Sequence, residues 1–271
     1  MKQLLHALPY TIGFLFPMIA FATFLGWIEF SWVLPIVAFV IIPILDQVLP
    51  YSEDNLSKED VEDLKESPVH SFLLMAMLPI QWVLIATLCI EVSTASFADL
   101  NWHWVGMIFS MGICCGTFGI NVAHELGHRN DRLSQFCAKG LLMSSLYMHF
   151  IIEHNRGHHR HVATDLDPAT SKKGQLVYHF WIQSTLGSLA SAWQLEEQRL
   201  HKKQLAWYHN EMIWMMLLQF TVVIGIGLTL GAVSMISFVF AATIGFLLLE
   251  TINYIEHYGL QRSLRDNGKF E

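Results

Sequence analysis

Six of the fourteen histidines in this 271-residue chain fall in three short motifs whose spacing suits metal binding. The motifs read HELGH at residues 124–128, EHNRGHH at residues 153–159 and NYIEHYG at residues 253–259. Residues four apart lie on the same face of an α-helix, so the imidazoles of the HELGH motif can converge on one metal ion. The second motif repeats this spacing. The candidate ligands are His124, His128, His154, His158, His159 and His257.

The number and type of these side chains indicate which metals they would bind. On a continuous helix His159 is turned by about 100° from His158, so one helix can present ligands to two metal positions. A catalytic zinc takes three protein ligands, and six imidazoles therefore fit two metal ions better. Nitrogen-rich sites with open positions suit iron that handles dioxygen, although imidazole also suits zinc and copper. HELGH alone is also the signature of zinc proteases, with Glu125 as general base.

Long apolar segments must position these motifs. Six of them are long enough, or nearly so, for the roughly 20 residues that a membrane-spanning helix needs. They cover residues 10–29, 32–49, 72–90, 104–123, 212–230 and 233–252. We therefore expect an all-α integral membrane protein, a single domain over residues 1–271 with six transmembrane helices. The pair Gly112 and Gly116, four residues apart, predicts close packing between two helices.

The overall composition excludes several other classes. The chain is 53% hydrophobic and only 14% charged, about half the charge of an ordinary soluble domain. Its net charge of −7 offers no basic surface for nucleic acid. The four cysteines form no CxxC pair, which argues against a disulfide scaffold or a zinc ribbon.

The positive charges predict an orientation. All 16 lysines and arginines lie at the chain ends or in the two long connections, 50–70 and 129–211, and none lies in the three opposite connections. The positive-inside rule therefore places both termini, both long loops and the three histidine motifs on the cytoplasmic side. The acid-rich segment 51–67 is expected to form an amphipathic helix on that surface.

The three histidine motifs resemble those of the membrane-bound alkane 1-monooxygenase (alkane hydroxylase) family, within the histidine-box di-iron oxygenases. The tracts VAT at 162–164, DPA at 167–169 and SAWQLE at 191–196 are similar to the family between its boxes. The EHYG element separates the chain from desaturases and sterol hydroxylases, which share the general plan. The resemblance implies a bacterial inner-membrane enzyme that hydroxylates the terminal methyl of n-alkanes with O₂.

The resemblance also implies the components of the site. The cofactor would be two non-haem iron ions held by the six histidines, with no catalytic residue besides the metal ligands. Three acidic residues would orient imidazole N–H groups or would instead form salt bridges with Arg156 and Arg160. These acidic residues are Glu125, Glu153 and Glu256.

The implied partners are an alkane from the bilayer and rubredoxin, itself reduced by a flavin-dependent, NADH-using reductase. Five basic residues could attract an acidic electron donor or could hold the loop to anionic lipid headgroups. They are Arg129, Arg132, Arg160, Lys172 and Lys173.

One departure from the family concerns the end of the sequence. Family members continue to a further box of the form HSDHH, whereas this sequence stops at Glu271. We expect a fragment of a longer gene product, and we expect the 271 residues alone to be inactive and to bind less than a full complement of iron. Three alternatives stay open: a histidine-box hydroxylase or desaturase of fatty acyl or alkyl-aromatic substrates, an intramembrane HExxH zinc protease, and a non-catalytic membrane protein with relic boxes.

Overall fold

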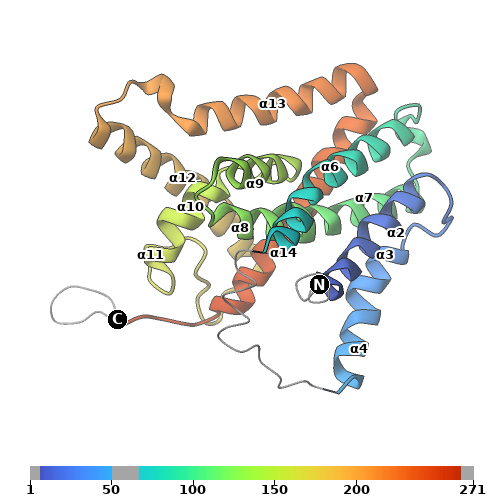
Figure 1. Ribbon diagram of the computed structural model, residues 1–271, viewed down its shortest axis with the longest axis horizontal. Helices are drawn as coiled ribbons and strands as arrows, with labels where there is room; N and C mark the ends of the chain where they lie inside the picture. The colour runs from blue at the N-terminus through green and yellow to red at the C-terminus, as the bar shows by residue number, and fades with distance from the viewer. Residues whose placement is uncertain (1–6, 51–66, 264–271) are drawn as a thin grey trace.

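The computed structural model describes residues 7–50 and 67–263, and all regular secondary structure in this part of the chain is helical (Figure 1). The expected all-α class is therefore confirmed. Segment 51–66, with the predicted amphipathic helix, lies outside the described residues.

Each predicted apolar segment forms helical structure over most of its length. The first forms a 3₁₀ turn, Pro9–Phe14, followed by α2, Leu15–Phe24. The second forms α3, Val33–Ile36, a π-helical turn, Val37–Ile41, and α4, Ile42–Val48. The other four are α6, Pro68–Glu91; α7, Trp102–Cys114, continued by a π-helical turn, Cys115–Asn121, and α8, Val122–Gly127; α13, Glu211–Leu230; and α14, Ala232–His257.

Four of these helices are long and apolar enough to cross a membrane: Pro68–Glu91, Trp102–Gly127, Glu211–Leu230 and Ala232–His257. The stretches Pro9–Phe24 and Val33–Val48 are apolar but shorter. The first helix ends at Phe24, earlier than the predicted residue 29, because the chain turns at Gly26, whose φ of 72° suits glycine.

The long connection between residues 129 and 211, expected as a loop, is largely helical. It contains α9, Arg132–Ser144; α10, Phe150–Glu153; a π-helical turn, His154–His158; α11, His159–His161; and α12, Val177–Lys203. Two 3₁₀ turns complete the described elements, Phe97–Asp99 and Trp207–His209. In Figure 1 the short helices α8, α10 and α11 gather beside the C-terminal part of α14.

Helix α14 packs against α7 and the π-helical turn that follows it, and glycines set their separation. A Cβ atom on Gly112 would lie 2.5 Å from Cγ2 of Ile244, and one on Gly245 would lie 2.5 Å from Cβ of Cys115. Such distances are far inside van der Waals contact. The close packing predicted from Gly112 and Gly116 is therefore confirmed, and it brings the first and third histidine motifs to one end of a rigid helix pair.

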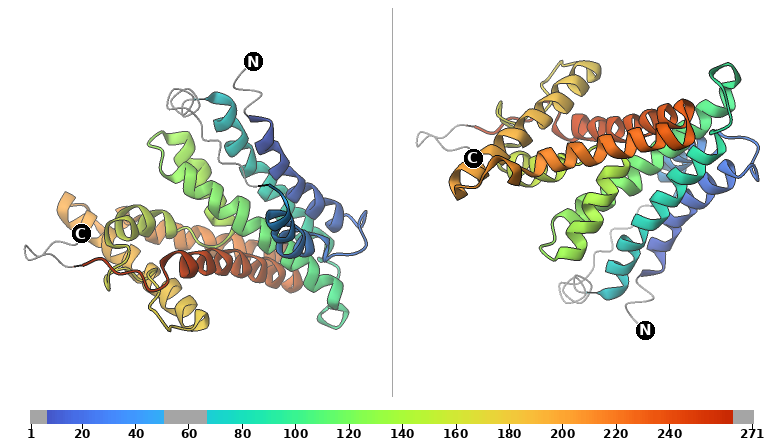
Figure 2. Two further views of the ribbon diagram at one scale, coloured as in Figure 1. Left: turned by 90° about the horizontal axis from the view of Figure 1, so that it is seen from below. Right: turned by 90° about the horizontal axis from the view of Figure 1, so that it is seen from above.

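Helices α13 and α14 form a tight hairpin and run side by side in Figure 2. Gly231 joins them with a φ of 89°, a conformation that other residues rarely adopt. Only Met212 and Met215 of α13 are buried, so most of this helix presents apolar side chains outward, as expected for a helix that faces lipid.

We predict that Gly245→Val destabilises the protein, because the larger side chain must push α14 away from Cys115 in the π-helical turn that follows α7. Overpacking of this kind costs about 1–3 kcal/mol. Thermal unfolding of the full-length protein in detergent should show a lower Tm for Gly245→Val than for the parent. Gly225→Val on α13 is the control, because no heavy atom lies within 4 Å of a Cβ built there. Equal Tm values for the two variants would contradict the proposed packing role.

Candidate metal centre

Four of the six predicted ligands converge in one group. The ligand nitrogens of His124, His128, His154 and His159 all lie within 4.8 Å of one another. Nε2 of His124 lies 2.7 Å from Nε2 of His154 and 3.1 Å from Nε2 of His128. We call this group the four-histidine cluster. Imidazole nitrogens at such separations form a donor set that could hold a metal ion.

The backbone of the second motif decides which of its histidines join the cluster. Residues His154–His158 form a π-helical turn, in which the N–H of His159 is directed to the carbonyl of His154, five residues earlier. In a π-helix residues five apart share a face. The i,i+4 pairing of His154 with His158 predicted from the sequence is therefore wrong. His154 pairs with His159, and their ring centroids are 4.4 Å apart.

His158 points to a second position, where it meets the third motif. Its ring centroid lies 5.0 Å from that of His257 at the end of α14. The rings of His154 and His158 stack at 5.2 Å, so the two positions are adjacent. The second motif thus divides its histidines between two neighbouring groups: His154 and His159 lie in the four-histidine cluster, and His158 lies beside His257.

Polar contacts hold the π-helical turn in place. Arg156 donates to Oε2 of Glu196 on α12 at 3.0 Å, and the Glu196 side chain is fully buried. Asn155 donates to the backbone carbonyl of Gly127 at 3.1 Å. The second motif is therefore tied to α12 on one side and to the first motif on the other.

The protonation of His154 and His159 in the second motif suits metal binding. Burial and the neighbouring imidazoles, His124 first among them, lower the pKa of His154 to about 2. Burial and the same kind of neighbour also lower the pKa of His159. Both rings are therefore neutral at pH 7, which is the form of histidine that binds metals.

The three acidic residues expected near the histidines have different environments. Glu125 is exposed and pairs with Arg129 at 3.4 Å, and Glu256 is also exposed. Glu153 is buried and accepts a hydrogen bond from Ser191 at 3.4 Å. Burial, reinforced by the charge of Asp167, raises the pKa of Glu153 to about 7. A salt bridge to Arg156 was the other role expected for these glutamates. The structure forms that salt bridge with Glu196 on α12, a residue that the sequence analysis did not select.

Two carboxylates that the sequence analysis did not select lie beside His158. Asp167 accepts a hydrogen bond from Nδ1 of His158 at 3.0 Å, and its side chain is fully buried. Glu250 on α14 is buried and accepts hydrogen bonds from Tyr147 at 2.8 Å and from Ser184. Glu250 could have been selected from the sequence, because it is an ionisable residue inside the apolar segment 233–252 and such residues are functional candidates.

The charges of these carboxylates give His158 electrostatic surroundings that differ from those of the four-histidine cluster. Burial lowers the pKa of His158, but the hydrogen bond and charge of Asp167, together with the charges of Glu153 and Glu250, outweigh burial and raise it overall. The four-histidine cluster is surrounded mainly by other imidazoles.

The four-histidine cluster is accessible from outside. A cavity of about 520 Å³, lined by polar groups that include Arg129, Asn130 and Gln135, opens onto His128 and His159. Both of these histidines are exposed, whereas His124 and His154 are half-buried. Small molecules can therefore reach one side of the cluster from solvent.

Comparison with known proteins identifies the family. The sequence model of the fatty acid desaturase family matches residues 100–270, which include all three histidine motifs. The chain belongs to this family. Within it, the chain is similar to alkane 1-monooxygenases along nearly its whole length.

Three relatives illustrate this similarity. Alkane 1-monooxygenase 2 of Pseudomonas aeruginosa is 34% identical over 248 residues, which cover 89% of this chain and 64% of that protein. Alkane 1-monooxygenase of Acinetobacter baylyi is 36% identical over 242 residues, covering 88% of this chain and 58% of that protein. Alkane 1-monooxygenase 2 of Alcanivorax borkumensis is 31% identical over 265 residues, covering 94% and 68%. The resemblance drawn from the motifs is thus confirmed, and the chain spans less than two thirds of the length of the first two relatives.

We predict that the two histidine groups act as separate units in metal binding. In the full-length protein, His124→Ala and His159→Ala should each weaken binding at the same position, by more than about 100-fold, since even a hydrogen-bond partner of a ligand is worth 10–100-fold. The double variant His124→Ala/His159→Ala should therefore lose no more iron than either single variant. His158→Ala/His159→Ala should lose iron from both positions.

Iron per chain, measured on purified protein, tests this prediction. His201→Ala provides the control, because His201 is exposed on α12 and outside the three motifs. Additive losses for His124→Ala/His159→Ala would show that these two histidines do not share an ion.

Proposed function

We propose that the full-length protein is a non-haem di-iron monooxygenase that hydroxylates the terminal methyl of n-alkanes. The observation that carries this proposal is the convergence of six histidines into two adjacent groups, in a chain that is similar to alkane 1-monooxygenases over about nine-tenths of its length. The reaction is R–CH₃ + O₂ + 2e⁻ + 2H⁺ → R–CH₂OH + H₂O.

The donor set fits iron. The four-histidine cluster would hold one ion, and His158 and His257 would contribute to the binding of a second. Neutral imidazoles are suitable ligands for iron in oxygen chemistry. Bound iron would supply the activation of O₂, which the side chains of the chain cannot perform by themselves.

The protein would supply the environment for the substrate. An alkane dissolves in the hydrocarbon core of the bilayer and has no polar group to recognise. An entirely apolar groove of about 370 Å³ lies between α2 and α6, with Phe14, Phe21 and Ile80 in its walls. Each additional buried CH₂ contributes about 0.8 kcal/mol, so such surfaces favour longer chains gradually and not with a sharp cutoff.

The electrons would come from a partner protein. We propose rubredoxin, reduced by a flavin-dependent and NADH-using reductase, as the donor. All four cysteines are buried and free, and none is arranged as an iron–sulfur ligand set in the described residues. Arg132, Arg160 and Lys172 are exposed and could attract an acidic donor protein.

A zinc protease fits the geometry less well. In that mechanism Glu125 would be a general base at the metal, but its carboxylate is exposed and pairs with Arg129. Nε2 of His154 lies 2.7 Å from Nε2 of His124, closer than the 3.1 Å between the Nε2 atoms of the HELGH pair, and the His159 ring centroid lies 5.0 Å from that of His128. One zinc per chain with no iron in the purified full-length protein would nevertheless support the protease.

We predict that cells producing the full-length protein with rubredoxin and its reductase convert octane to 1-octanol. With ¹⁸O₂, one ¹⁸O atom should enter each alcohol molecule, and mass spectrometry of the product measures it. His128→Ala should reduce turnover below detection, because it removes one nitrogen from the four-histidine cluster.

Parallel assays define the substrate class. Product from hexadecane supports the alkane proposal, whereas oxidation of xylene or a fatty acid with no product from alkanes would favour an alkyl-aromatic or fatty acyl substrate. His201→Ala should retain the parental rate. Turnover and iron content retained in His128→Ala would contradict the assignment of the cluster.

We also propose that all six apolar segments cross the bacterial inner membrane, with both termini and the histidine motifs on the cytoplasmic side. The distribution of the 16 lysines and arginines supports this orientation. The two shorter helical stretches, Pro9–Phe24 and Val33–Val48, would complete the six spans.

We predict that cysteines placed at opposite ends of the helices label differently. Ala98 lies in the exposed turn between α6 and α7, and Lys202 lies near the end of α12. In intact spheroplasts a membrane-impermeant maleimide should label Ala98→Cys and leave Lys202→Cys unlabelled until the membrane is opened. The native cysteines are all buried and serve as the background control. The reverse labelling pattern would contradict the orientation.

A further inference from the structure

The carboxylate of Asp167 occupies a place that the histidine motifs do not predict. It lies eight residues after the second motif, in the connection between α11 and α12, and no part of its side chain is exposed. Buried carboxylates are rare unless they are paired or hydrogen-bonded. The contacts of Asp167 therefore indicate what it does.

The hydrogen bonds of Asp167 come from three directions. Oδ2 accepts from Nδ1 of His158 at 3.0 Å and from Oγ1 of Thr170 at 2.5 Å. Oδ1 accepts from the backbone N–H of Ala169 at 3.0 Å. The Thr170 and Ala169 bonds fix the carboxylate to its own turn, so that it presents a lone pair to His158 from a rigid support.

This contact selects one tautomer of His158. An ionised carboxylate only accepts hydrogen bonds, so Nδ1 of His158 must carry a proton. The Nε2 atom is then the one that can bind a metal ion, on the ring that faces His257. Metal-binding histidines commonly donate their other N–H to a carboxylate in this way, which fixes the ring and makes the metal-binding nitrogen more basic.

The other candidate carboxylates do not make this contact. Glu250 is occupied by Tyr147 and Ser184, and Glu153 by Ser191. Glu125 pairs with Arg129. Of the acidic residues in the described part of the chain, Asp167 is the one whose recorded hydrogen bond is to a histidine of the three motifs.

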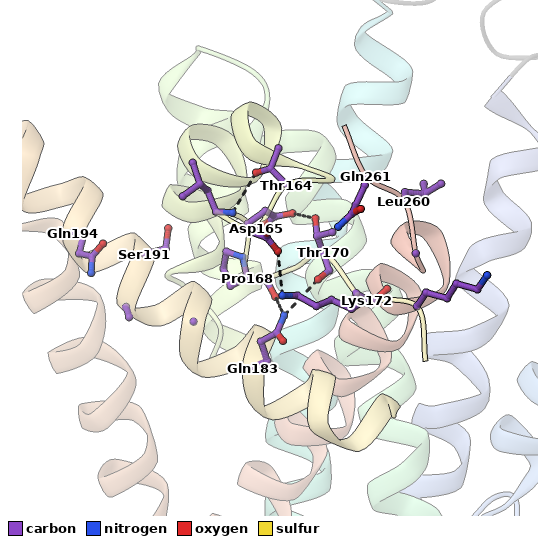
Figure 3. Close-up of a pocket in the computed structure, with 17 residues that line it drawn as sticks. Thr164, Asp165, Pro168, Thr170, Lys172, Gln183, Ser191, Gln194, Leu260 and Gln261 are labelled. Carbon is purple, nitrogen blue, oxygen red and sulfur yellow. Dashed lines mark hydrogen bonds and ion pairs between the residues drawn. The ribbon is translucent and has the colours of Figure 1, made fainter. Parts of the chain in front are cut away.

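Asp167 also borders a groove that is open to solvent. The groove has a volume of about 680 Å³ and lies between the 164–173 segment, α12 and residues 259–261. Figure 3 shows Thr164, Asp165, Pro168 and Thr170 on one wall and Gln183, Ser191 and Gln194 of α12 on another. Asp165, in contrast to Asp167, is exposed and pairs with Lys172 at 3.1 Å.

We propose that Asp167 is the positioning residue for the second metal position, where it orients His158 so that Nε2 binds the ion. The proposal rests on the proposed di-iron function. It assigns the orienting role to Asp167 in place of the three glutamates of the histidine motifs.

The test compares three variants of the full-length protein loaded with ⁵⁷Fe. Asp167→Ala removes the acceptor, and we expect iron to fall from two ions per chain towards one, with about 10–100-fold weaker binding of the lost ion to the protein. Thr170→Ala is the matched control for the turn, because it removes a side chain that bonds to Asp167 and to the N–H of Ala163 but leaves His158 untouched. Asp165→Ala is the control for a nearby charge. Asp165→Ala should keep the parental iron content, and Thr170→Ala should lose less iron than Asp167→Ala because the backbone N–H of Ala169 still holds the carboxylate.

Asp167→Asn serves as a second variant that keeps the size of the side chain. It should fold as the parent does, bind the second iron more weakly, and change the Mössbauer quadrupole splitting of one iron while leaving the other as in the parent. These measurements do not depend on alkane turnover, so they separate orientation of the metal site from general loss of activity.

The outcomes are distinguishable. A parent protein without iron would overturn the proposed function itself. A parent with two irons, together with parental iron content and Mössbauer spectrum in both Asp167 variants, would overturn the role of Asp167 alone. Equal iron loss in Thr170→Ala and Asp167→Ala would show that the turn, and not the hydrogen bond to His158, maintains the site.

Discussion

The hydrogen bond across five residues in the π-helical turn His154–His158 is the constraint on which the metal centre depends. An α-helical turn at this point would place His154 and His158 on one face and direct His159 elsewhere. The extra residue in the turn rotates the chain so that His159 joins His154, while His158 turns towards His257. A single local change in backbone hydrogen bonding therefore divides one histidine motif between two positions that touch each other.

The turn can only have this effect because the other two motifs are brought to it. Helix α14 approaches α7 closely at Gly112 and approaches the π-helical turn after α7 closely at Gly116 and Gly245, so the HELGH motif and His257 end up at the same end of this helix pair. Helix α12 then fixes the second motif through the ion pair between the buried Glu196 and the exposed Arg156.

The two positions differ in their electrostatic surroundings. The four-histidine cluster consists of imidazoles that lower one another's affinity for protons, whereas His158 is bordered by Asp167, Glu153 and Glu250. Neighbouring anions stabilise positive charge on His158 and would likewise stabilise a cation bound beside it. The two histidine groups thus differ in character: the four-histidine cluster is open to a polar cavity through His128 and His159, whereas His158 is bordered by buried carboxylates.

The sequence by itself determined the all-helical class, the six apolar helical stretches and the six candidate ligands, because these depend on local composition and on motifs of a few residues. It also predicted that a second helix packs closely at Gly112 and Gly116, since small residues four apart in an apolar helix are typical of close helix–helix contacts. The tertiary structure alone decided which histidines meet, because the π-helical turn is a backbone choice that ideal α-helical spacing does not reveal. The same holds for Asp167 and Glu196, whose roles arise from contacts with residues on other elements. Helix α9 of the 129–211 connection is different, because its buried residues Cys137, Ala138, Leu141 and Leu142 follow helical spacing, a pattern that the sequence itself contains.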